Sequence, residues 1–148
     1  MSHRPVLAGP SLPGMRMLHL GLRVTDLERS LAFYTAVGYA ELGRVPETGF
    51  GSLTMLKLPG DPYVSLELVH DPARPVKDIG AVNHLVIQVD DLHATIAGLA
   101  AKGVTAEPAA ELGAGFWTSW LTDPDGYRIE LVQWPPGHPP GMTEADFV

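Results

Sequence analysis

Two stretches of the chain alternate apolar with other residues, as strands with one buried face do. The apolar positions are Leu20, Leu22 and Val24 in the first stretch, and Leu85, Ile87 and Val89 in the second. Because side chains alternate along a strand, the positions in between share the opposite, less apolar face. That face carries His19, Gly21 and Arg23 in the first strand, and His84, Val86 and Gln88 in the second. Each apolar face is expected to be covered by a helix.

A helix is predicted directly after each of these strands. The first starts at the capping-box pattern Thr25-Asp26-Leu27-Glu28 and stops at Gly38, a residue that favours helix ends. The second starts at Asp90 or Asp91 and stops at Gly103. The apolar stripes of the two helices consist of Leu27, Leu31, Tyr34 and Val37, and of Leu92, Ile96 and Leu99.

The two strand–helix units belong to an internal duplication. The stretch MLHLGLRVTDLERSLAFYTAVGY aligns with VNHLVIQVDDLHATIAGLAAKGV, so that His84 matches His19 at an offset of 65 residues. Later, YVSLELV aligns with GYRIELV, so that Glu130 matches Glu67 at an offset of 63 residues. The sequence therefore predicts two halves built on one plan, with a short gap between their registers.

Several further strands complete each half. They are expected at residues 39–45, 50–58 and 63–70, and at residues 104–107, 116–122 and 127–133. This order of elements predicts an α+β fold. We expect an N-terminal extension at 1–16, a first module at 17–76, a second module at 77–134 and a tail at 135–148. The tail is rich in proline and glycine, so it is expected to be extended or partly disordered, or instead to lie over a site.

Two histidines and two glutamates occupy equivalent positions of the duplicated halves. Like His19 and His84, the side chains of Glu67 and Glu130 are predicted on the less apolar faces of their strands. If the sheet curves, these faces line a trough that contains all four side chains. Two imidazoles and two carboxylates suit Zn²⁺, Ni²⁺, Co²⁺, Mn²⁺ or Fe²⁺. The alternative is that the histidines are ordinary sheet residues and the glutamates are solvated.

Composition and charge narrow the range of possible sites and binding partners. The chain has 148 residues, a net charge of −7 and no cysteine, which excludes disulfides, thiolate metal sites and a cysteine nucleophile. Without a basic cluster, neither nucleic acid nor an anionic membrane is an expected partner. No segment has the pattern of a signal peptide or the length of a membrane span, so a cytoplasmic protein with a small-molecule substrate is expected.

Together, the ordered motifs resemble the vicinal oxygen chelate superfamily. They read HLGLRVTDLERSLAFYTAVGY, SLELV, NHLVIQVDDL and DPDGYRIELV, within the span from Met17 to Trp134. The resemblance implies two tandem βαβββ modules, a curved mixed sheet that forms a trough, and helices packed on its convex face. Within the superfamily the chain is most similar to glyoxalase I (lactoylglutathione lyase).

The resemblance to glyoxalase I implies roles for five residues. His19, Glu67, His84 and Glu130 stand at the positions of its metal ligands. It also implies a homodimer in which the sites are shared between subunits, with one divalent ion per site, Ni²⁺, Co²⁺ or Zn²⁺ ahead of Fe²⁺ or Mn²⁺. Arg23 stands where the family contacts a carboxylate of the thiol.

The implied reaction is the conversion of the hemithioacetal of a 2-oxoaldehyde into a 2-hydroxyacyl thioester, with Glu130 as the catalytic base. Asp71 stands where glutathione-specific members carry asparagine, which leaves the identity of the thiol open.

Three other functions remain open. A metal-dependent epimerase would use the same ligands and carboxylates. A ring-cleaving dioxygenase would use two histidines and one glutamate around Fe²⁺, although Glu67 would then occupy a position that O₂ or substrate needs. A drug-binding resistance protein would need no metal ligands at all.

Overall fold

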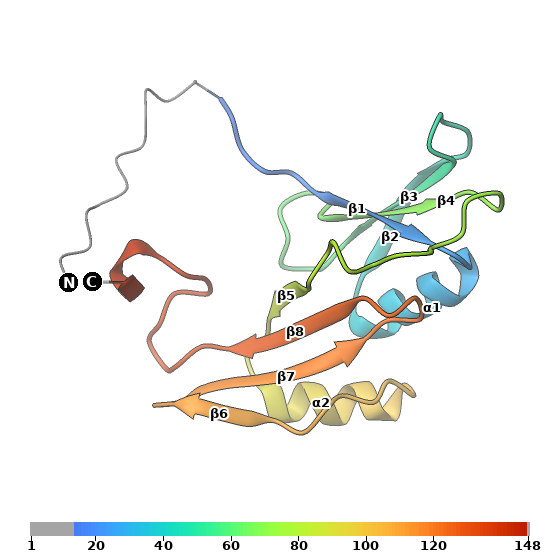
Figure 1. Cartoon of the computed structure of the whole chain (residues 1–148). Helices are drawn as coiled ribbons and strands as arrows, with labels where there is room; N and C mark the ends of the chain where they lie inside the picture. Colours follow the sequence, from blue (N-terminus) through green and yellow to red (C-terminus); the bar gives the residue numbers. More distant parts are fainter. Residues whose placement is uncertain (1–13, 148) are drawn as a thin grey trace.

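The computed structural model describes residues 14–147 and shows two modules of the same construction (Figure 1). The expected extension at 1–16 lies almost entirely outside the described residues. The first module consists of β1 (Leu20–Val24), α1 (Leu27–Val37), β2 (Ala40–Val45), β3 (Ser52–Lys57) and β4 (Leu66–His70). Its four strands form one sheet in the order β1-β4-β3-β2. Strands β1 and β4 are parallel, and the other pairs are antiparallel.

The second module repeats this order. It consists of β5 (Leu85–Gln88), α2 (Leu92–Ala101), β6 (Ala110–Gly113), β7 (Phe116–Thr122) and β8 (Arg128–Gln133). Its sheet has the order β5-β8-β7-β6, with β5 and β8 parallel. The prediction of an α+β fold with two tandem βαβββ modules is therefore confirmed. Figure 1 shows the two sheets side by side, with α2 along the outside of the second and α1 beside the β7–β8 turn.

The prediction of a strand at residues 104–107 is wrong, because this segment forms no strand and β6 begins only at Ala110. The backbone N–H of Val104 still donates to the carbonyl of Leu99 and so ends α2. One backbone hydrogen bond then joins Glu107 to Trp120, and the next residue, Pro108, has no N–H to donate. Pairing with β7 can therefore develop only beyond the proline.

The first helix begins one residue later than a Thr25-capped box would require. Asp26 is the N-cap, and its side chain accepts a hydrogen bond from the backbone N–H of Arg29. The Thr25 hydroxyl instead accepts from the backbone N–H of Val76 in the segment between the modules. Gly38 ends the helix at φ +128°, as predicted. In the second helix, Asp91 rather than Asp90 is the cap.

The predicted apolar faces form the core. Side chains that are fully or nearly fully buried include Leu22, Val24, Leu66, Leu68, Ile87, Ile129 and Leu131, from β1, β4, β5 and β8. Tyr34 of α1 packs on this core, whereas Leu27, Leu31 and Val37 of the predicted stripe are only partly buried. The opposite faces of the same strands therefore remain free to carry the polar candidates.

The tail folds back on itself after β8 and is not extended. The ring of His138 stacks on Trp134, and a short 3₁₀ helix spans Glu144–Phe147. None of the helices within residues 14–147 is long and apolar enough to cross a membrane.

Candidate active site

The first pair of candidate ligands is held by the parallel register of β1 and β4. Gly21 lies opposite Glu67, so His19, two residues before Gly21, projects from the same face as the carboxylate. The Nε2 atom of His19 lies 2.9 Å from Oε2 of Glu67. Both side chains are partly accessible, with 32% of His19 and 14% of Glu67 exposed. An imidazole nitrogen and a carboxylate oxygen thus converge at one point that solvent can reach.

The second pair has the same register in the second sheet. Val86 lies opposite Glu130, and His84 again precedes that position by two residues. The Nδ1 atom of His84 lies 2.6 Å from Oδ1 of Asn83, which leaves Nε2 as the nitrogen available for a ligand. The structural equivalence of the two pairs supports the duplication that the sequence predicted.

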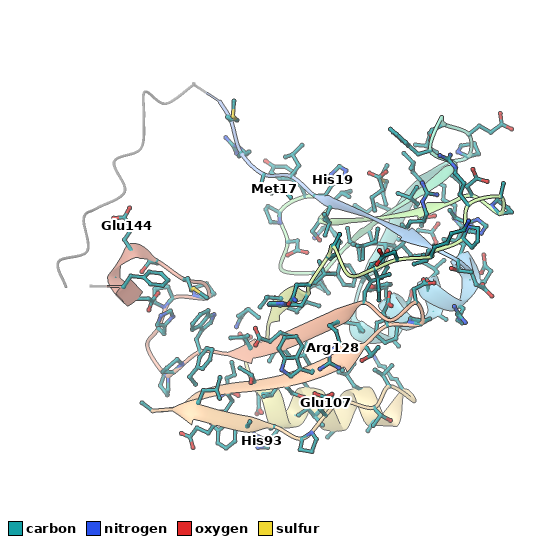
Figure 2. All side chains as sticks on the ribbon, viewed as in Figure 1. Met17, His19, His93, Glu107, Arg128 and Glu144 are labelled. Atoms are coloured by element: carbon teal, nitrogen blue, oxygen red, sulfur yellow. The ribbon has the colours of Figure 1, made fainter. Side chains whose placement is uncertain are left out.

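The two pairs do not come together within one chain. Among residues 14–147, no group of three or more metal-ligating side chains lies close enough to hold one ion. Figure 2 shows His19 at the start of β1, on a different sheet from Arg128 at the start of β8, the strand that carries Glu130. The four candidate ligands therefore fall into two separate pairs, one on each sheet.

Arg23 lies on the same face of β1 as His19. Its Nη1 atom is 3.5 Å from the carbonyl oxygen of Phe50, in the loop between β2 and β3. A second arginine, Arg74, donates from Nη2 to the neighbouring carbonyl of Gly49 at 2.9 Å. The two guanidinium groups thus hold consecutive carbonyls of one loop.

Asp71 is already engaged by this second arginine. The Nε atom of Arg74 donates to Oδ2 of Asp71 at 2.8 Å, and the N–H of Ala73 donates to Oδ1. The pKa of Asp71 lies below its ordinary value, chiefly because of the hydrogen bond from Arg74 and also because of the charge of Arg23. Sequence reasoning missed Arg74, although its spacing of three residues from Asp71 is compatible with a local ion pair.

Sequence reasoning also missed an aromatic residue beside the second pair of candidate ligands. Trp120 is the register partner of Glu130, so both side chains project from the same face. Its ring contacts His84 edge-on at a centroid distance of 5.2 Å, and the guanidinium of Arg128 lies 5.0 Å above it. The alternation in FWTSWLT could have placed Trp120 on this face.

The hollows of the surface differ in how they relate to these residues. A groove of about 620 Å³ beside His19 is lined mostly by apolar side chains, among them Leu18, Leu42, Tyr63 and Val64. A larger hollow of about 950 Å³ lies between the modules and contains none of the candidate ligands. Tyr39 lines this larger hollow, and burial, with a smaller contribution from Asp61, raises its pKa to about 12. The groove beside His19 is therefore the one of these two that a candidate ligand lines.

The chain is similar to several known proteins. The sequence model of the Glyoxalase/Bleomycin resistance protein/Dioxygenase superfamily matches residues 16–131. A probable lactoylglutathione lyase of Vibrio parahaemolyticus is 37% identical over 124 residues, which cover 80% of this chain and 90% of the relative. The lactoylglutathione lyase of Haemophilus influenzae is 34% identical over 125 residues, covering 80% and 93%.

Two solved structures are also similar. The trypanothione-dependent glyoxalase I of Leishmania major is 31% identical with a TM-score of 0.67, covering 81% of this chain and 87% of that one. TnmS3, an antibiotic binding protein from Streptomyces sp. CB03234, is 25% identical with a TM-score of 0.67, covering 83% and 98%.

Proposed function

Because the chain belongs to the Glyoxalase/Bleomycin resistance protein/Dioxygenase superfamily, we propose that it is a metal-dependent lyase of the glyoxalase I type. Its substrate is the hemithioacetal of a 2-oxoaldehyde and a thiol, and its product is a 2-hydroxyacyl thioester. The observation that carries this proposal is the His–Glu pair that recurs in the same register on both sheets. The names of the relatives, lactoylglutathione lyases at 34% and 37% identity, point to the same reaction.

The donor atoms fit a divalent transition metal. His19 and Glu67 place a nitrogen and a carboxylate oxygen 2.9 Å apart on an accessible face, and His84 keeps one ring nitrogen available. Together with Glu130 they form a set of two nitrogen and two carboxylate ligands, which suits Ni²⁺, Co²⁺ or Zn²⁺ ahead of Fe²⁺ or Mn²⁺. When bound, one such ion supplies a Lewis acid that stabilises negative charge on two neighbouring substrate oxygens.

The complete site requires a second copy of the chain. Within residues 14–147 the two pairs form no joint cluster, so four ligands can meet only between subunits. We propose a homodimer in which His19 and Glu67 of one chain meet His84 and Glu130 of the partner subunit. A closed two-fold dimer then contains two equivalent sites.

Glu130 is assigned the proton transfer. Its carboxylate removes the proton from the carbon that bears the sulfur and the hydroxyl group, and it returns that proton to the adjacent carbon, which was the ketone carbonyl. The hydroxyl proton of the first carbon passes to the oxygen of the second, so the first carbon becomes the thioester carbonyl and the second bears the hydroxyl. The proton count is unchanged, as an isomerisation requires. Trp120 lies on the same face as Glu130, and its ring contacts His84 edge-on.

Arg23 is assigned the anchoring of the thiol. Its guanidinium lies on the same face as the first pair of candidate ligands, and its one hydrogen bond in the described structure, to Phe50, is long. A guanidinium in this situation can bind a substrate carboxylate through two parallel hydrogen bonds. Asp71 does not neutralise Arg23 directly, because its carboxylate is held by Arg74.

A second candidate function is the binding of a drug without chemistry. Two observations favour it: the likeness to the antibiotic binding protein TnmS3 and the apolar groove beside His19. Under this alternative the four ligands would have no metal to hold, and binding would not depend on added ions.

Metal-free protein reconstituted in parallel with Ni²⁺, Co²⁺ and Zn²⁺ tests both functions. The metal content of the protein is measured first, and thioester formation is then followed with methylglyoxal and a panel of thiols that includes glutathione. One ion per chain together with turnover supports the lyase. No turnover with any thiol and metal overturns it, and metal-independent antibiotic binding by such a sample supports the second function.

A further inference from the structure

The β7–β8 turn of the second module is docked on the corner between β1 and α1 of the first. The carboxylate of Asp125, only 3% exposed, accepts hydrogen bonds from the backbone N–H of Thr25 at 3.2 Å and from the hydroxyl of Ser30 at 3.3 Å. The Nη2 atom of Arg29 lies 3.8 Å from the same carboxylate. The turn thereby provides an acceptor for the backbone N–H of Thr25, the residue before the N-cap Asp26 of α1.

Tyr127 extends this contact to β1 itself. It precedes β8 and is buried, with 6% of its surface exposed. Its hydroxyl donates a hydrogen bond to the backbone carbonyl of Arg23 at 3.0 Å. The residue assigned to hold the thiol is therefore fixed through its backbone by a side chain of the other module.

Asp123 makes the turn rigid. Its Oδ1 atom accepts from the backbone N–H groups of Asp125 and Tyr127, at 2.9 and 2.8 Å. Its Oδ2 atom accepts from the hydroxyl of Tyr34 in α1 at 2.7 Å. Burial raises the pKa of Asp123, and these three donors compensate part of that cost. Tyr127 therefore directly follows a turn that is held in one conformation by these hydrogen bonds.

Within residues 14–147, the first module makes no equivalent hydrogen bonds to the second. Its corresponding loop carries Asp61, which accepts from the N–H of Leu58 and the hydroxyl of Ser65 within the same loop. The position in α2 that matches Tyr34, 65 residues later, is Leu99, which has no hydroxyl to donate. The docking is thus specific to the side of the molecule where Arg23 lies, and is not a general requirement of the module.

We infer that Tyr127 is a positioning residue for Arg23 and sets how strongly the guanidinium holds an anionic thiol. This inference rests on the proposed lyase function. Two parallel hydrogen bonds to a carboxylate require a narrow geometry, so a small shift of the backbone at residue 23 weakens them. Chemistry at Glu130 of the partner subunit does not depend on that backbone, and neither does the binding of a thiol without a charge.

The test compares the hemithioacetals of methylglyoxal with mercaptoacetate and with 2-mercaptoethanol, which is similar in size but uncharged. In Tyr127→Phe, KM for the charged substrate should rise about fivefold, the equivalent of one ordinary hydrogen bond. Its kcat and both constants for the uncharged substrate should stay unchanged. Tyr39→Phe is the matched control, because it also removes a hydroxyl from a buried tyrosine but lies away from Arg23.

A double-mutant cycle separates positioning from general stability. If Tyr127 acts through Arg23, Tyr127→Phe should change nothing further in an Arg23→Ala background. An undiminished effect in that background overturns the inference, as does an equal loss with both thiols. Asp125→Asn, which keeps an acceptor for Thr25, should show a weaker form of the same selectivity, and it serves if Tyr127→Phe does not fold.

Different results would overturn the proposed lyase function and the role of Tyr127. A wild-type protein that turns over neither substrate with any metal overturns the proposed lyase and the role of Tyr127 with it. A wild-type protein that is active, with a Tyr127→Phe variant of unaltered selectivity, overturns only the role of Tyr127.

Discussion

His19 and Glu67 meet across the parallel strands β1 and β4, with Nε2 of the imidazole 2.9 Å from Oε2 of the carboxylate. The register that brings them together recurs for His84 and Glu130 on β5 and β8. Half of the proposed four-ligand set is therefore built by strand pairing within each module. The two halves would meet only when two subunits associate, and heterodimers of mutant subunits can test this.

Heterodimers should recover activity from two inactive subunits. In His19→Ala the first His–Glu pair is lost, and in His84→Ala the second is lost, so each homodimer should be inactive. A heterodimer of the two, purified with two different tags, contains one intact site and should show about half of the wild-type activity if the sites are shared between subunits.

The matched control is a heterodimer of His19→Ala with Glu67→Gln subunits. Both changes lie in the first module, so neither site of this heterodimer is intact and no activity should return. If the His19→Ala and His84→Ala heterodimer is equally inactive, the shared site is refuted.

Replacing Glu130 by glutamine should separate binding from proton transfer. The amide keeps the shape of the side chain but cannot take up a proton, so kcat should fall roughly 10²- to 10⁴-fold. Loss of a charged ligand should also weaken metal binding, so kcat is measured at saturating metal, with the metal content of the sample determined in parallel. Glu28→Gln, at a side chain that is 81% exposed, should leave kcat unchanged. Full activity in Glu130→Gln would exclude Glu130 as the base.

The alternation of apolar residues was sufficient to predict the faces of β1, β5 and β8, because a buried face constrains every second residue. The duplication then indicated that His19 and Glu67 are matched by His84 and Glu130. Both inferences depend on patterns that repeat within a short stretch of chain, which is why one sequence could reveal them.

Contacts between distant segments left no such pattern. The bond between Tyr34 and Asp123 joins residues 89 positions apart, and that between Tyr127 and Arg23 joins residues 104 apart. Neither pair is related by a helical or strand period, so neither could be predicted. The absent strand at 104–107 shows a different limit, since Val104 and Ala106 alternate with polar residues but Pro108 prevents continued pairing.

Arg74 should protect the positive charge of Arg23. In Arg74→Ala the carboxylate of Asp71 loses its strongest partner, so its pKa should rise toward the ordinary value while it stays ionised at neutral pH. The freed carboxylate can then compete with a substrate carboxylate for Arg23. KM for the mercaptoacetate hemithioacetal should increase several-fold, with little change for the uncharged substrate.

The double variant Arg74→Ala with Asp71→Asn should restore KM, because the competing charge is removed. Arg44→Ala is the matched control, since Arg44 also pairs with an acid three residues away, Glu41, on the exposed strand β2. If Arg74→Ala raises KM equally for both thiols, its effect is structural and Asp71 does not compete for Arg23.

The tail should respond to pH through His138 and Asp146. The Nε2 atom of His138 lies 2.5 Å from Oδ1 of Asp146, and this hydrogen bond is the main reason that the pKa of His138 is raised. The pKa of Asp146 is lowered, first by the backbone N–H of Thr143 and then by His138. A histidine whose pKa is raised in the folded state stabilises that state. This contribution is complete at pH values below the pKa of the unfolded state and is lost as pH rises through the pKa of the folded state.

For Asp146, whose pKa is lowered in the folded state, the contribution to stability is present at pH values above the pKa of the unfolded state. It is lost as pH falls through the pKa of the folded state. The ion pair should therefore hold the tail best between about pH 4 and pH 6.5, the ordinary pKa values of the two groups. An NMR titration of the His138 ring should show a midpoint that falls toward the ordinary value in Asp146→Asn and stays in place in Glu144→Gln. Equal midpoints in wild type and Asp146→Asn would mean that the pair does not form in solution, and the fold of the tail would then rest on the stacking of His138 on Trp134.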